Sequence, residues 1–133
     1  MIEFRLDGHS KVATYMQIVQ QVRQAIRLGR LDPGDRLPTV REVAESLAIN
    51  PNTVLKAYRE LELEGLVEAR TGSGTFVRRT NPGRALPSQA ALERELAAWL
   101  RKTRAAGWEQ EDVVALIETT LRATYEGRRE GAA

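Results

Sequence analysis

A chain of 133 residues with a net charge of +2 is long enough for one domain, or for a small domain with an appendage. It contains no cysteine, which excludes a disulfide framework and a cysteine-based zinc site. No apolar run approaches the roughly 18 residues of a membrane span and no signal peptide opens the chain, so we expect a cytoplasmic protein. The pI near 9.3 is only a weak sign of nucleic-acid binding.

The first predicted elements are a short strand and an amphipathic helix. Residues 2–6 alternate apolar and polar side chains, which predicts a short edge strand. Residues 14–28 carry apolar side chains at helical spacing, and Gly29 ends this helix. Residues 32–35 place proline and glycine at the two central positions of a type II turn, and Arg36 follows where a cation could meet phosphate.

A helix-turn-helix pattern comes next. Thr39 is an N-cap with a glutamate at capping-box spacing, and residues 40–47 form the first helix. Asn50 suits the N-cap of a second helix with proline at its first position, which Gly65 ends. The Tyr58 ring belongs to its apolar stripe, and we expect the hydroxyl at the surface.

The first turn of this second helix exposes polar side chains. In helix-turn-helix proteins the corresponding residues face base edges in the major groove. Asn52 and Thr53 are therefore candidate DNA contacts, although Thr53 could equally only close the helical turn. Lys56, one turn further, is a candidate phosphate contact or a plain surface charge. Asn50 is better explained as a cap than as a base reader.

A glycine-rich hairpin follows the two helices. Residues 67–70 and 75–78 are patterned as strands, and the loop between them consists of Thr71, Gly72, Ser73 and Gly74. A loop without bulky side chains can bring backbone N–H groups close to phosphates. A helix-turn-helix followed by a hairpin is a winged helix.

Linker-like composition at residues 80–87 separates a DNA-binding domain, residues 1–79, from a second domain, residues 88–133. Ser88 is expected to cap one helix, and a second helix spans residues 110–126. Their apolar stripes are too wide for two helices to cover on each other, so we expect a dimer with a four-helix cluster. The predicted interface comprises Leu92, Leu96, Trp99, Leu100, Val113, Leu116, Ile117 and Leu121.

Residues 10 to 78 resemble the DNA-binding domain of the GntR family of bacterial transcription regulators. The matching residues run from Gly29 to Pro38, and continue through Val40-Arg41-Glu42, Asn50 to Val54, Ala57-Tyr58 and Gly72 to Val77. The resemblance implies a mainly α fold with a small β-hairpin wing, namely an N-terminal winged helix-turn-helix followed by a two-helix dimerisation hairpin. The short C-terminal domain is similar to the YtrA type, which is associated with transport operons.

The resemblance also makes Arg41 a principal DNA contact, because its guanidinium can bind guanine bidentately; the alternative is a solvated surface arginine. Ser73 stands at the wing tip, where Lys or Arg is frequent in the family, so we expect a weaker electrostatic contribution from the tip. Pattern and resemblance together assign to DNA the residues Arg36, Thr39, Arg41, Asn50, Asn52, Thr53, Lys56, Thr71, Gly72, Ser73 and Gly74.

These features predict a homodimeric transcription regulator, a repressor, on a two-fold symmetric operator, and the family resemblance implies an inverted repeat of the GT…AC kind. The alternative is a winged-helix protein-interaction module that does not read DNA. An enzyme is disfavoured, because the chain has one histidine and lacks a nucleophile elbow, a phosphate loop and a metal-spaced cluster. No cofactor or metal is expected. The sequence identifies no small-molecule effector, which would have to bind at the dimer interface or between the domains.

Overall fold

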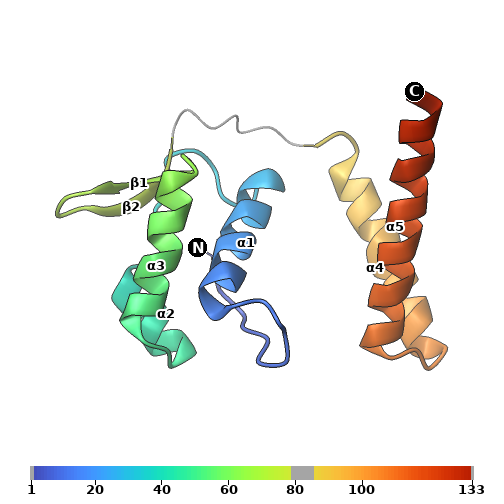
Figure 1. The fold of residues 1–133 in the computed structure, drawn as a ribbon, viewed down its shortest axis with the longest axis horizontal. Coiled ribbons are helices and arrows are strands. Elements are labelled where there is room, and N and C mark those ends of the chain that lie inside the picture. The colour runs from blue at the N-terminus through green and yellow to red at the C-terminus, as the bar shows by residue number, and fades with distance from the viewer. Residues whose placement is uncertain (1, 79–85, 133) are drawn as a thin grey trace. The chain divides into compact units, whose positions relative to one another are not determined.

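In a computed structural model the chain forms two compact units, Met1–Leu86 and Pro87–Ala133 (Figure 1). The structure describes residues 2–78 and 86–132, so most of the predicted linker at residues 80–87 lies outside the described residues. The fold is mainly helical with one two-stranded antiparallel hairpin, which confirms the predicted fold class.

The first unit is built around one central helix. Its elements are α1 (Thr14–Arg27), α2 (Val40–Leu47), α3 (Pro51–Leu63), β1 (Val67–Arg70) and β2 (Gly74–Val77). Helix α3 packs against α1, α2 and β1. The core draws on every element, because the spacing of the apolar side chains gives each one a buried face. Its fully buried members include Ile18, Val19, Val22, Leu37, Val54, Leu61, Val67 and Val77.

The turn between α2 and α3 is held by local capping. The Thr39 hydroxyl accepts the N–H of Glu42 at 3.1 Å, and the Asn50 side chain accepts the N–H of Asn52 at 2.8 Å. Ala48 closes α2 in the left-handed conformation, with φ 54°. Both predicted N-caps are therefore confirmed, and each satisfies a backbone amide that would otherwise lack a partner.

The predicted edge strand at residues 2–6 is wrong, because this described segment forms no strand. The side-chain amide of Gln21 instead bonds both backbone groups of Arg5, at 2.9 Å to the N–H and 2.6 Å to the carbonyl. Gln17 does the same with Asp7, at 2.8 and 3.1 Å. Two glutamines of α1 thus take the place of a partner strand, and the alternating pattern reflects the burial of Phe4.

A third extended segment lies alongside the wing. Arg36 pairs with Phe76 as an antiparallel bridge. The N–H of Leu37 donates to the Thr75 carbonyl, and the N–H of Val77 donates to the Asp35 carbonyl, both at 2.8 Å. The segment just before α2 is therefore bonded to β2, which fixes the wing against the helix-turn-helix. The sequence had suggested only the two strands of the hairpin.

The hydroxyl of Tyr58 is buried, not at the surface as expected. Tyr58 is 4% exposed, and its hydroxyl donates to the carbonyl of Pro38 at 2.6 Å. Burial, which disfavours the charged phenolate, raises the pKa of Tyr58 above its ordinary value. This hydrogen bond ties the middle of α3 to the residue that precedes the cap of α2.

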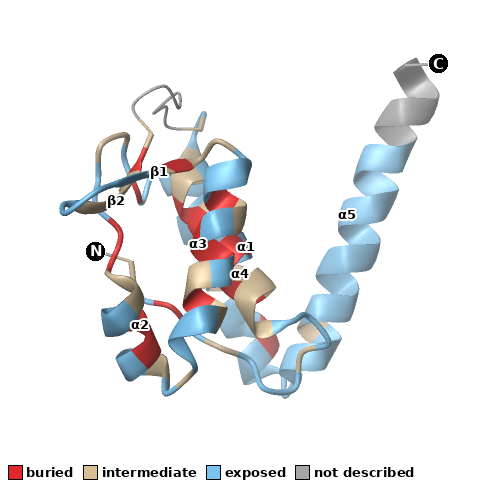
Figure 2. Cartoon of the chain, turned by 60° about the vertical axis from the view of Figure 1, so that its left-hand side comes forward, coloured by how far each residue is buried: buried red, intermediate tan, exposed pale blue. Residues whose placement is uncertain are grey.

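The second unit is a helical hairpin of α4 (Gln89–Ala105) and α5 (Gln110–Ala132), which extends past the predicted end at residue 126. Ser88 precedes α4 but its side chain makes no capping bond, because the residue has a positive φ of 57°; that expectation is corrected. Almost every described residue of α5 is exposed (Figure 2). The hairpin therefore buries little apolar surface within one chain.

We predict that Tyr58→Phe destabilises the protein by about 1–3 kcal/mol, because it leaves a buried carbonyl acceptor without its donor. Urea unfolding measures the loss. Tyr15→Phe is the matched control with an expected change below about 0.5 kcal/mol, because the ring stays under Lys56 and the lost hydroxyl makes no hydrogen bond within the described residues. Equal effects of the two substitutions would contradict the role of this bond.

The difference in unfolding free energy between the wild type and Tyr58→Phe should also depend on pH. The folded-state pKa of Tyr58 lies above its unfolded value near 10, so its contribution is fully present below that pH and is lost as the pH rises. The stability gap between the wild type and Tyr58→Phe should therefore narrow above about pH 10. A gap that stays constant through that range would count against a buried, neutral hydroxyl.

We predict that Gly74→Ala costs more stability than Gly72→Ala. At Gly74 the φ is +119° and an added Cβ would lie 3.0 Å from Arg36 Nε, whereas at Gly72 the φ is +75° and nothing lies within 4 Å. We expect a loss of about 1–3 kcal/mol at Gly74 and about 1 kcal/mol at Gly72, measured by urea unfolding. Arg36→Ala should recover part of the Gly74→Ala loss. Equal losses without such recovery would refute the contact.

Candidate nucleic-acid interface

The first turn of α3 presents small polar groups on a fixed backbone. Asn52 is exposed and Thr53 half-buried, while the opposite side of the helix lies in the core. The N–H of Thr53 donates to the Asn50 carbonyl at 3.0 Å and closes the first turn. The side-chain oxygen of Asn50 acts as the cap and accepts the N–H of Asn52. The first amides of α3 therefore have partners, and the side chains of Asn52 and Thr53 are the groups that this turn can offer to a ligand.

Arg41 lies on α2, close to the start of the helix. Its side chain is 89% exposed, and its Nε lies 3.2 Å from Oε1 of Glu45 one turn further on. Ion pairs this exposed contribute little to stability, so the guanidinium is available to a base or a phosphate. Thr39 has no such freedom, because its hydroxyl caps α2.

Lys56 is held by an aromatic ring from another helix. Its Nζ lies 4.1 Å from the centroid of the Tyr15 ring on α1. A cation over a ring face is favoured by the ring quadrupole, and the contact narrows the positions that this long side chain samples. Lys56 is thus a positioned surface cation on the exposed part of α3. The sequence placed Tyr15 in the core stripe and gave no signal for this contact.

The wing carries its charges on one face of its strands. In the register of the hairpin Arg70 pairs with Gly74, and Glu68 pairs with Phe76. The Arg70 guanidinium lies 4.4 Å from the Phe76 ring centroid and bonds Glu68 Oε1 at 2.8 Å. The side chain of Arg36 lies against Gly74. Arg36 and Arg70 come from different segments, and both neighbour Gly74 and Phe76 of β2.

The loop at the end of the wing is exposed from Thr71 to Ser73, and Figure 1 shows the hairpin projecting away from the helices. The N–H of Ser73 donates to the Arg70 carbonyl at 3.0 Å, so this amide closes the turn and is not available to a phosphate. Arg70 was not among the residues predicted to contact DNA. Strand alternation from Glu68 could have found it, because both side chains stand on the same face.

The residues predicted to form the dimer interface all lie in the second unit. Leu121 is 55% exposed, and Trp99 and Val113 are half-buried. The two helices line an open hollow of about 510 Å³ whose surface is mainly apolar. Large exposed apolar side chains on one hairpin are typical of a surface that a partner covers. They are Leu92, Leu96, Leu100, Leu116, Ile117 and Leu121, together with Val114 and Tyr125.

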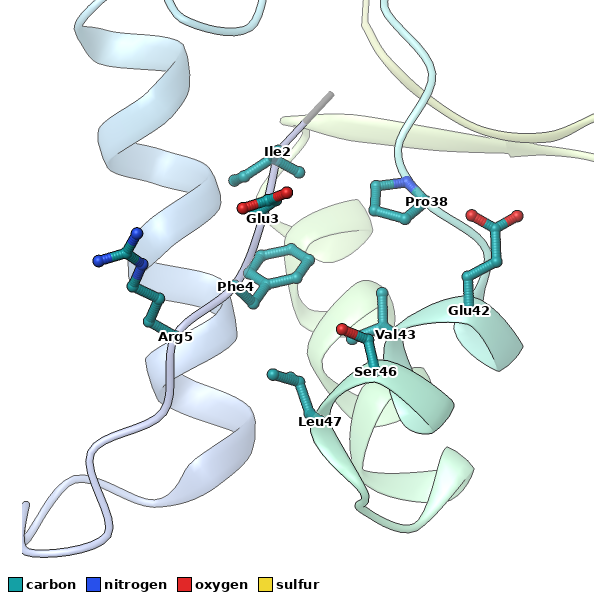
Figure 3. A pocket seen from close by; sticks show the side chains of 9 residues that line it. All are labelled: Ile2, Glu3, Phe4, Arg5, Pro38, Glu42, Val43, Ser46 and Leu47. Carbon is teal, nitrogen blue, oxygen red and sulfur yellow. The ribbon is translucent and has the colours of Figure 1, made fainter.

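A second hollow, of about 390 Å³, lies between the N-terminal segment and α2 (Figure 3). Phe4 and Ile2 line one side, and Val43 and Leu47 line the other. Glu42 and other polar side chains stand at its edge, but their charges are mixed and no buried polar atom lacks a partner among the described residues. The hollow therefore shows no selectivity for a particular ligand.

Among residues 2–78 and 86–132 no group of three or more His, Asp or Glu side chains is placed to hold a metal ion. In the same ranges no helix is long and apolar enough to cross a membrane.

Residues 14–77 match the family of bacterial regulatory proteins called gntR. The chain is 47% identical over 73 residues to the HTH-type transcriptional repressor YtrA of Bacillus subtilis, a match that spans 55% of this chain and 56% of the repressor. It is 44% identical over 89 residues to the HTH-type transcriptional regulator Rv1152 of Mycobacterium tuberculosis, spanning 67% of this chain and 74% of that protein. These relatives are transcription regulators and not enzymes.

Solved structures agree. YtrA from Sulfolobus acidocaldarius, a GntR-family transcription factor, superposes with a TM-score of 0.54 at 32% identity, covering 74% of this chain and 97% of that one. The DNA-binding domain of AraR, in complex with operator ORX1, superposes with a TM-score of 0.50 at 26% identity, covering 57% and 95%. Motif, fold and relatives agree, and the chain belongs to the GntR family of bacterial regulatory proteins, in its YtrA-like subgroup.

Proposed function

We propose that this protein is a sequence-specific DNA-binding transcription regulator, a repressor, that binds a two-fold symmetric operator as a homodimer. The observation that carries the proposal is the exposed Arg41 on α2, which packs against α3 with its polar first turn, on a fold whose relatives include a named repressor. In this account the first unit binds DNA and the second unit dimerises.

The N-terminal turn of α3 enters the major groove, where Asn52 and Thr53 contact base edges or nearby phosphates. Arg41 takes a guanine through its two terminal nitrogens, a geometry that a guanidinium matches well. Lys56, over the Tyr15 ring, neutralises a phosphate beside the groove. Arg36 and the wing contact the sugar-phosphate backbone of the DNA next to α3, the helix that lies in the groove.

The second unit supplies the two-fold symmetry. Its apolar side chains remain exposed in one chain, and a second copy of the same hairpin would cover them with a matching surface. Two recognition helices would then meet half-sites about one helical turn apart, or a multiple of it. A small-molecule effector would find an enclosed pocket only where the second copy closes the hollow of about 510 Å³. Control of a transporter operon follows from the resemblance to the YtrA type.

We predict that Arg41→Ala costs about 1–3 kcal/mol of specific binding and relaxes selectivity at one base pair. Duplexes selected from a random pool by the wild type and by the variant give the two consensus sequences, and competition binding gives the affinities. The fold should be unaffected, because the side chain is 89% exposed.

Arg27→Ala, an exposed arginine in the last turn of α1, is the charge-matched control and should keep the wild-type consensus. An unchanged consensus and affinity for Arg41→Ala would rule out its role. If the wild type selected no consensus at all, an interaction module would be the better explanation.

We predict that Leu121→Glu converts the dimer to a monomer. The side chain is 55% exposed in one chain, so the fold survives, but a buried carboxylate is costly at a dimer interface. Sedimentation velocity should show half the wild-type mass, and operator binding should weaken by more than about tenfold because the two half-sites are no longer linked. Leu63→Glu, at an 82% exposed position on α3, should remain dimeric. A dimeric Leu121→Glu variant would contradict the assigned interface.

A further inference from the structure

The charge of the wing lies on its face and not at its tip. Ser73 at the tip is neutral, whereas Arg36 and Arg70 lie on the strands behind it. Arg36 belongs to the segment before α2, forms a bridge with Phe76 and packs its side chain against Gly74. Arg70 is the cross-strand partner of the same glycine. Arg36 and Arg70, which are distant in sequence, therefore approach β2 from its two sides, and the pairing places their side chains on the same face of the wing.

Arg70 is held in position by two contacts on this face. Its guanidinium stacks on the Phe76 ring at 4.4 Å, which leaves the edges of the group free to donate hydrogen bonds. One oxygen of Glu68, Oε1, accepts from both Nη2 at 2.8 Å and Nε at 3.3 Å, and a phosphate oxygen can accept from the same two donors. The Arg70 and Glu68 side chains are 40% and 41% exposed, so solvent reaches the pair and a ligand can reach it as well.

We propose that Arg70, together with Arg36, binds a phosphate of the DNA backbone, and that Glu68 occupies Arg70 in the free protein and is exchanged for that phosphate on binding. The inference rests on the proposed DNA-binding function and adds to it a wing contact and its internal competitor. An exposed carboxylate pair is a weak competitor, since water screens it. A duplex phosphate carries a full charge and releases counterions when it is neutralised.

The exchange makes Glu68 a residue that lowers affinity. Its carboxylate must give up Arg70 and then stands close to a negatively charged backbone, so its charge opposes binding at both steps. Removing that charge should tighten binding, and it should do so only while Arg70 is present. A general change in net charge would act whether or not Arg70 is there, which separates the two explanations.

The test uses the full chain and a random-sequence duplex of about three helical turns, because phosphate contacts do not depend on sequence. Fluorescence anisotropy across a salt series gives the affinity and the salt slope for four proteins: wild type, Arg70→Ala, Glu68→Gln and the double variant. We expect Arg70→Ala to bind about tenfold more weakly with a salt slope smaller by about 1. Glu68→Gln should bind about three- to tenfold more tightly, and the double variant should match Arg70→Ala.

The matched controls are Arg27→Ala and Glu62→Gln, which make the same changes in charge at exposed positions on helices, outside the strands of the wing. Arg23 Nε lies 3.2 Å from Glu64 Oε2, so the two controls lie on neighbouring helix ends, about two or three turns from Tyr15 and Lys56. Each control should change affinity by less than about twofold. Arg70→Lys keeps the charge without the planar fork and should fall between the wild type and Arg70→Ala.

The outcomes separate this inference from the proposed function. A wild type that binds neither this duplex nor its own upstream DNA at low salt overturns both. Tight wild-type binding with Arg70→Ala no weaker than Arg27→Ala overturns the phosphate contact alone. Tightening by Glu68→Gln that persists in the double variant overturns the exchange. Circular dichroism melts establish that each variant is folded, and if Arg70→Ala is not, Arg70→Lys and Glu68→Gln still decide the question.

Discussion

The arrangement of the first unit depends on the short segment of residues 34–38. Its backbone bonds β2 at three points, with the N–H groups of Gly34 and Leu37 donating to the strand and the Asp35 carbonyl accepting from it. Its last residue, Pro38, accepts the buried hydroxyl of Tyr58 from α3. The same segment leads directly into the cap of α2. Hydrogen bonds of these few residues therefore fix the wing, α2 and α3 to one another. The side chain of Leu37, in the same segment, is buried in the core.

A frame of this kind fixes individual cations in a chain whose net charge is only +2. Each of three cations in the proposed DNA interface is positioned by a neighbour from another segment: Lys56 by the ring of Tyr15, Arg36 by its bridge to the wing, and Arg70 by the ring of Phe76. Local placement of a few charges can therefore stand in for a large overall charge. Acidic side chains beside them, such as Glu68, adjust how strongly each cation is available.

The helices and the hairpin could be predicted from the sequence because their signals are local. Thr39 and Asn50 bond amides two or three residues away, so capping chemistry gives both helix starts. The third segment of the wing could not be predicted, because the pairing of Arg36 with Phe76 joins distant parts of the chain. The strand predicted at residues 2–6 was wrong for a related reason. The alternating pattern suggested a strand, but the side chains of Gln17 and Gln21, from a helix later in the chain, make the hydrogen bonds to this segment's backbone. Tyr58 was assigned correctly to the core, but its hydroxyl partner is also a tertiary contact. The candidate DNA contacts divide in a similar way. Those on α2 and α3 come from a motif, whereas Arg70 lies outside it and is marked only by its alternation with Glu68 along the strand.

We propose that this frame reads duplex DNA, and equilibrium binding of the purified protein to duplex from its own upstream region tests the proposal. The titration is run across a salt series with scrambled duplex as competitor. We expect preference for the upstream duplex over the scrambled one, with log affinity falling linearly and steeply against log salt concentration. Equal affinity for both duplexes, or binding that does not respond to salt, would contradict it.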